Sequence, residues 1–260
     1  MNGPAVFGLV LSIIFASASP TFAQDTAEDW DLTVDPAQRL TLATLDFGGN
    51  AVALRCKGGK LDLLLTGTPL STEEFRIVRV TAGAIAGERQ SWQTHAGMPV
   101  LSASEPDRLA RQLRAGGELD VRIEPQATGE PPLRFRLTAP PSPASLERVL
   151  SACGAPLTDD WDLRPRVSSQ NLVWEHQAFP QYPETAALRR IPLASVRLAC
   201  IVPADGRLNE CRVLSETPER LGFGRNALVA ARNSRVALPE NDPGLVGKVI
   251  VYTVRYRAPE

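Results

Sequence analysis

Cysteine is the residue type in this chain best placed for covalent chemistry. Cys200 and Cys211 lie on either side of Asp205-Gly206. Asp-Gly between two runs of alternating apolar residues is typical of a β-hairpin, because both residues tolerate the backbone of a tight turn. With Asp205 and Gly206 as the central residues, Cys200 faces Cys211 at a Cα separation that a disulfide accepts, about 4.4 to 6.8 Å. A longer turn would shift the register by one residue and leave the two as neighbours. The spacing predicts a cross-strand disulfide, with two ordinary buried thiols as the alternative.

The other two cysteines, Cys56 and Cys153, are each expected on the buried face of a regular element. Cys56 ends an apolar strand, and Cys153 belongs to a helical stripe of apolar residues that ends at Gly154. Four cysteines allow three pairings. We predict Cys56–Cys153 together with Cys200–Cys211, because only this pairing keeps each bridge within one domain.

Residues that could serve catalysis or bind a metal are sparse. His95 and His176 are each alone in their local sequence, and no G-x-S-x-G motif or zinc-ligand spacing occurs. Acidic clusters at 25–31 and 159–162 lack the pattern of a calcium loop. Both contain Asp-Trp-Asp-Leu, which we interpret as a polar segment with one anchoring tryptophan ahead of each domain. We therefore expect no enzyme activity, no cofactor and no metal.

One glycine motif resembles a dinucleotide-binding sequence. Residues 222–227, Gly-Phe-Gly-Arg-Asn-Ala, match G-x-G-x-x-A between an expected strand and helix. The preceding strand, however, is the second arm of a hairpin, and only one more strand follows before the end of the chain. Because a doubly wound sheet cannot form from these elements, the motif predicts a helix start and not a nucleotide site.

The N-terminal segment predicts export. Ala5–Ala18 is an apolar run too short to cross a bilayer, which takes about 20 residues, and small residues follow it at Ala18 and Ala23. We assign 1–23 to a signal peptide. No Lys or Arg precedes the run, so an uncleaved membrane anchor is the alternative. Disulfides require an oxidising compartment, and we expect the periplasm of a Gram-negative envelope.

The overall charge argues against two classes of partner, nucleic acids and anionic membranes. The chain has 28 basic and 29 acidic residues and a formal net charge of −1. This balance argues against a nucleic-acid-binding surface and against a polybasic membrane surface.

The first half of the mature chain, residues 24–156, is predicted to be a mostly-β domain with two helices, and it resembles no family that we recognise. A Gly58-Gly59 turn pairs 51–56 with 61–65 and places Cys56 opposite Leu61. The remaining expected elements are strands at 75–81, 118–124 and 133–138, one helix capped by Ser104 and a second from Ser142 to Gly154. Residues 157–171 are expected to be a linker.

The last part of the chain, residues 172–260, is predicted to be a second, small domain. The expected order is a helix starting at Pro183, strands at 195–203 and 207–215, a helix at about 221–233, and a final strand at 248–257. Together with the first half, this order predicts an α+β fold.

Several short sequences in this region are familiar in their order and spacing. They are Pro180-Gln181-Tyr182-Pro183, Ala186-Ala187, the V-x-L-x-C-x-V strand, Asp205-Gly206, V-L-S-E-T-P at 213–218, and the final V-I-V-Y-T-V strand. Residues of about 172–258 resemble the C-terminal domain of TonB. The resemblance implies a three-stranded antiparallel sheet backed by helices.

The resemblance also implies a function and a set of contact residues. The TonB domain binds the short N-terminal box of outer-membrane receptors, which adds as a strand beside the domain's last strand. By matching position, Gln181, Tyr182 and Pro183 would contact the receptor, and Val249, Val251 and Thr253 would lie on the pairing strand. The expected protein is thus a periplasmic binding protein that contacts TonB-dependent receptors in support of transmembrane transport.

Three other functions remain open from the sequence. TonB itself has a transmembrane helix and a long Pro-rich span where this chain has a short apolar segment and a folded domain. An uncleaved N-terminus would make the protein a membrane-anchored energy transducer. It could otherwise be an envelope structural or assembly protein that shares only the fold, or a secreted enzyme built on the first half.

Overall fold

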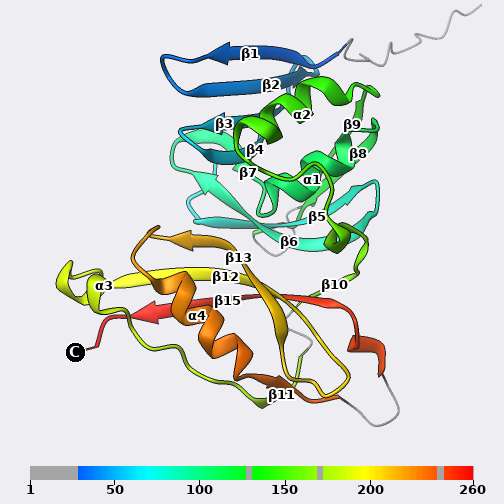
Figure 1. Ribbon diagram of the computed structural model, residues 1–260. Coiled ribbons are helices and arrows are strands. Elements are labelled where there is room, and N and C mark those ends of the chain that lie inside the picture. Colours follow the sequence, from blue (N-terminus) through cyan, green and yellow to red (C-terminus); the bar gives the residue numbers. More distant parts are fainter. Residues whose placement is uncertain (1–28, 127–130, 169–171, 239–242, 260) are drawn as a thin grey trace, which may run out of the picture.

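The computed structural model describes residues 29–126, 131–168, 172–238 and 243–259 (Figure 1). The predicted signal peptide lies outside these residues. The described chain is mostly β, with sheets of nine, four and two strands and four α-helices. Two 3-10 helices, η1 (Asp160–Leu163) and η3 (Pro243–Leu245), complete the regular structure.

The nine-stranded sheet is antiparallel at every neighbouring pair, in the order β1-β2-β3-β4-β7-β6-β5-β8-β9. Its strands are β1 (Asp31–Asp35), β2 (Leu40–Asp46), β3 (Ala51–Lys57), β4 (Lys60–Thr66), β5 (Phe75–Ala82), β6 (Ile85–His95), β7 (Met98–Ser102), β8 (Gly117–Ile123) and β9 (Leu133–Ala139). The predicted hairpin of β3 and β4 has the expected register, with Cys56 opposite Leu61. Strands β1, β2, β6 and β7 were not predicted from the sequence.

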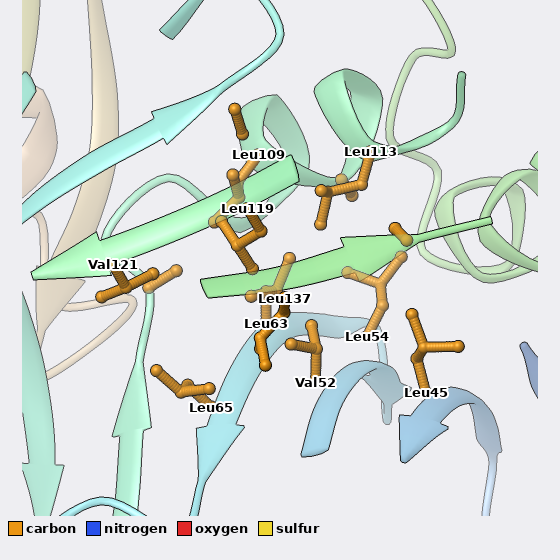
Figure 2. Close-up of a cluster of buried hydrophobic side chains, with 14 of the residues drawn as sticks. Leu45, Val52, Leu54, Leu63, Leu65, Leu109, Leu113, Leu119, Val121 and Leu137 are labelled. Carbon is orange, nitrogen blue, oxygen red and sulfur yellow. The ribbon is translucent and has the colours of Figure 1, made fainter. Parts of the chain in front are cut away.

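Leucines and valines on one face of this sheet form its core. Figure 2 shows side chains of β2, β3 and β4 directed toward those of β8 and β9, with Leu109 and Leu113 of α1 above β8 and β9 in this view. The two ends of the strand order therefore come close across the core, and the sheet curls around it. Trp30 is buried in the same core, as its place ahead of the domain predicts.

Two helices cover this core. α1 (Pro106–Leu113) begins after Glu105 and not at the predicted Ser104, while α2 (Pro143–Ala152) follows Ser142 as predicted. The Cys56–Cys153 disulfide, confirmed here with a Cα separation of 5.5 Å, ties the end of α2 to β3. Because it joins residues 97 apart in sequence, it stabilises the fold by about 4 to 5 kcal/mol on the chain-entropy account.

The second half contains a four-stranded sheet in the order β10-β15-β12-β13, and β11 and β14 form a separate pair. The elements are β10 (Arg166–Ser168), β11 (Trp174–His176), α3 (Glu184–Leu188), β12 (Leu193–Ile201), β13 (Asn209–Thr217), α4 (Phe223–Arg232), β14 (Arg235–Val236) and β15 (Val249–Arg257). α4 packs on one face, where Ile250, Tyr252 and Tyr256 contribute to a core with Phe223 and Ala227.

The predicted fold class is wrong. We expected an α+β chain whose second part has a three-stranded TonB-like sheet. The structure has instead a mostly-β chain dominated by a nine-stranded sheet, and its second sheet has a fourth strand, β10, which runs parallel to β15. The error arises because β10 is three residues long and comes from the segment that was expected to be a linker.

The Cys200–Cys211 disulfide is also confirmed, with a Cα separation of 4.1 Å. The turn differs from the predicted one. The Gly206 N–H donates to the Pro203 C=O, and the Gly206 C=O accepts the N–H of Val236 in β14. The loop is longer than a two-residue turn, and register shifts in β12–β13 keep Leu198 opposite Val213 and the two cysteines face to face.

The segment between the two sheets is held by both of them. Trp161 is buried against Ala199 and Ile201 on the face of the second sheet that α4 does not cover. Asp162, next in the chain, accepts two hydrogen bonds from Arg111 of α1, at 2.6 and 2.9 Å. Residues 157–171 therefore include η1 and β10, which fix the second sheet against α1.

Candidate functional site

The final strand, β15, has a different partner along each part of its outer edge. Its inner edge pairs with β12 over its whole length, from Val249 to Arg257. Its outer edge pairs with β10 only from Val249 to Val251. Beyond Val251, no described residue pairs with this outer edge.

Backbone alternation identifies the groups that face the open edge. In an antiparallel ladder, alternate residues direct both N–H and C=O to the same partner. Ala258 N–H bonds to Pro192 C=O before β12, and Val249 N–H bonds to Pro165 C=O before β10. Even-numbered residues therefore face β12 and odd-numbered residues face outward. Arg255 and Arg257 direct their N–H and C=O groups to the open edge, as does Thr253 at its start.

A groove lies beside this edge. Its volume is about 130 Å³, and it is bounded by β15, by α4 and by the segment that precedes α3. The lining residues on β15 are Tyr252–Arg255, those on the segment are Gln177–Pro180, and those on α4 and its end are Ala227, Ala230, Ala231 and Ser234. Alanine side chains leave space above the helix, so one apolar side chain of a ligand fits there.

The segment 177–181 is held along α4 and not along β15. Ser234 Oγ accepts the Ala178 N–H at 3.1 Å and donates to the Ala230 C=O at 3.0 Å. Farther along, Asn226 Nδ2 donates to the Gln181 C=O at 2.9 Å. Between these two attachments Phe179 is 88% exposed. The segment thus forms the far side of the groove, with an aromatic side chain at its mouth.

The three residues assigned to receptor contact from the family resemblance lie in different environments. Gln181 is exposed next to the groove. Tyr182 packs edge-on against Phe223, and its hydroxyl donates to the Ile191 C=O. Pro183 is buried ahead of α3. Of the three, only Gln181 has a side chain free to contact a ligand, because the other two belong to the core.

The three residues assigned to the pairing strand are also divided. Val249 and Val251 have β12 on one side and β10 on the other, so their backbone groups are not free to pair with an added peptide. Val249 is buried against Trp161. Thr253 is exposed and lines the groove. Thr253 therefore lines the groove, and Gln181 directly follows Pro180, the last lining residue of the segment before α3.

Residues that the sequence reasoning missed complete the groove. The alanines and Ser234 are spaced at three, four and seven along α4, a stripe of small residues that indicates close approach of another segment. Phe179 precedes the Pro-Gln-Tyr-Pro sequence and was not considered. Arg255 was placed on the strand but was given no role. Tyr252, beside it, is buried, and burial raises its pKa, so its hydroxyl stays protonated at neutral pH.

The two histidines and the glycines of the motif at 222–227 do not line the groove. His95 Nε2 lies 2.7 Å from Ser102 Oγ, a pairing that the sequence did not indicate. Gly222 adopts a left-handed backbone (φ 89°) at the start of α4, as the interpretation of its motif as a helix start requires. No group of three or more His, Cys, Asp or Glu among the described residues is placed to hold a metal ion.

Comparison with known proteins adds no family. No family model matches the chain, and no curated protein matches it. The two disulfides are consistent with an exported protein. In the ranges that the structure describes, no helix has the length and apolar character needed to cross a membrane.

Proposed function

We propose that the protein is a periplasmic binding protein that takes up an extended peptide as an added strand along Thr253–Arg257. The proposed ligand is the N-terminal box of an outer-membrane TonB-dependent receptor, on the basis of the sequence resemblance of residues 172–258. Binding would support transport across the outer membrane. No catalytic step is required of the protein.

One observation carries the proposal. The N–H and C=O groups of Arg255 and Arg257 point to an edge that no described residue occupies, beside a groove that accepts a side chain. Unpaired main-chain groups at a sheet edge are the usual source of affinity in strand addition, and a neighbouring pocket supplies selectivity. In an added strand, alternate side chains point toward α4, where the alanines leave room.

The test is titration of a synthetic receptor-box peptide into the mature protein. Arg255→Pro removes one outward N–H and places a ring at the edge. One lost hydrogen bond costs about 1 kcal/mol, so we expect the affinity for the peptide to fall by about fivefold or more. Arg255→Ala keeps the N–H and serves as the matched control, with a smaller loss. Val251→Pro is unsuitable, because β10 pairs with that residue and the fold would suffer.

Modification of the peptide provides a second, independent test. In an added strand, every second N–H of the peptide bonds to β15 and the others face away. N-methylation should therefore abolish binding at one set of alternate positions and leave it nearly unchanged at the other set. Equal effects at both sets, or unchanged affinity in a folded Arg255→Pro variant, would rule out strand addition at this edge.

A further inference from the structure

One end of the second sheet carries exposed arginines and leucines side by side. We call this end the arginine-rich tip. It comprises Leu188, Arg189, Arg190, Leu193, Arg255 and Arg257. It lies where α3 leads into β12 and where β15 ends, at the side of Figure 1 on which the C-terminus is marked.

Backbone pairing brings these residues together from distant parts of the sequence. Leu193 is the pairing partner of Arg257, and the strand neighbours of these two residues pair in turn, so Arg255 lies two residues inward. Arg190 N–H bonds to Ala187 C=O, which holds the end of α3 next to the start of β12. In Figure 1, α3 and the end of β15 extend beyond the nine-stranded sheet, away from β10.

Positive charge exceeds negative charge among the described residues of the tip and its neighbours. None of its four arginines has an ion pair with a described residue, and all four are exposed. Two acidic residues lie close to the tip along the chain, Glu184 at the start of α3 and Glu260 three residues after Arg257, and the four arginines outnumber them. The overall net charge of −1 therefore conceals a local basic surface, contrary to what the composition led us to expect.

The same surface exposes large apolar side chains. Leu188 is 85% exposed and Leu193 is 63% exposed. Basic residues alone would suit any polyanion, but arginines that flank exposed leucines match a lipid bilayer, whose headgroups are charged and whose interior is apolar. We propose that the arginine-rich tip docks on the surface of a bilayer that contains anionic phospholipid, with Leu188 and Leu193 entering the headgroup region.

The proposal is tested by flotation of the mature protein with lipid vesicles. We expect binding to vesicles of phosphatidylcholine with phosphatidylglycerol and little binding to phosphatidylcholine alone. Arg189→Gln with Arg190→Gln should weaken partitioning about 25-fold, at about fivefold for each arginine. Leu188→Ser should weaken it about tenfold, and higher salt should weaken the binding of the wild type.

A matched control separates the tip from net charge. Arg148→Gln with Arg232→Gln makes the same change in charge at two exposed arginines of α2 and the far end of α4, and it should bind vesicles as the wild type does. Equal losses in the two double variants would overturn the proposal. The proposal would also be overturned if the wild type did not bind anionic vesicles but bound polyglutamate through the tip, because the partner would then be an acidic protein segment. Neither variant alters the peptide groove, so receptor-peptide binding can fail while vesicle binding holds, and the reverse.

Discussion

At the scale of single residues, Asp159 shows how a carboxylate attaches the segment between the two sheets to β13 of the second sheet. It accepts the Trp161 N–H at 3.1 Å and a bond from Arg212 at 2.6 Å. The Arg212 guanidinium also stacks on the Trp161 ring, 3.9 Å from its centroid. Burial alone would raise the pKa of Asp159, but the hydrogen bonds from Trp161 and Arg212 outweigh it and hold the pKa below its usual value.

This lowered pKa leads to a prediction on pH dependence. A group whose pKa is lower in the folded state stabilises the fold above its unfolded pKa, about 3.9 for aspartate, and loses that contribution as the pH falls through the folded value. The wild type should therefore exceed Asp159→Asn in free energy of unfolding by a constant amount above about pH 5, with the difference shrinking below about pH 4. Denaturant titrations of both proteins across this range measure it. A difference that grew on acidification would contradict the assignment.

At the scale of elements, the connection between β12 and β13 depends on one glycine. Gly206 has φ of 73°, and a Cβ added there would lie 2.3 Å from the Val236 C=O oxygen of β14. The close approach exists because the Gly206 C=O accepts the Val236 N–H. Gly206 is thus required both for its backbone conformation and for the absence of a side chain.

A comparison of two glycines separates these requirements. Gly59, in the turn between β3 and β4, has φ of 85° and no atom within 4 Å of an added Cβ. Gly59→Ala should cost only the conformational term, about 1 kcal/mol. Gly206→Ala should cost clearly more, because β14 must also move. Urea titrations give the free energy of unfolding of each variant. Equal losses of stability would show that the close contact with Val236 adds no cost of its own.

At the scale of the whole molecule, the two sheets are joined through buried ion pairs. Glu105, at the start of α1, bonds to Arg166 of β10 at 2.9 Å, and both side chains are more than nine-tenths buried. The half-buried Arg197 of β12 donates to the Ser91 C=O of β6. Burial lowers the pKa of Arg197, an effect that the charge of Glu105 opposes and that of Arg166 reinforces. The Glu105 carboxylate therefore interacts with two cations at the junction, the guanidinium groups of Arg166 and Arg197.

Removal of this carboxylate should be costly. Glu105→Ala leaves Arg166 buried without its partner, and loss of one member of a buried pair costs about 3 to 5 kcal/mol. Glu118→Ala is the control, since its pair with Arg136 has both side chains more than half exposed, and such pairs contribute at most about 1 kcal/mol. Thermal unfolding followed by circular dichroism compares them. A Glu105→Ala variant as stable as Glu118→Ala would mean that the junction contributes little.

The sequence by itself determined the features whose signals are local. The β3–β4 register follows from alternation around a glycine turn. Cys200–Cys211 follows from the Asp-Gly hairpin, and Cys56–Cys153 follows from pairing the two remaining buried cysteines within one domain. Most helices and strands of the second half were predicted to within a few residues, because their apolar periodicity and turn residues occur within each element. Gln181 and Thr253 were found by resemblance and lie next to the groove.

Only the tertiary structure decided which strand edges are covered. β10 has three residues and no distinctive pattern, yet it pairs with β15 from Val249 to Val251, whereas no described residue pairs with the same edge at Arg255 and Arg257. Every residue except proline offers the same backbone N–H and C=O groups, so pairing between distant strands leaves little trace in the sequence. The alanines of α4, the segment at Phe179 and the arginine-rich tip are likewise brought together by long-range packing, which no local pattern of side chains specifies.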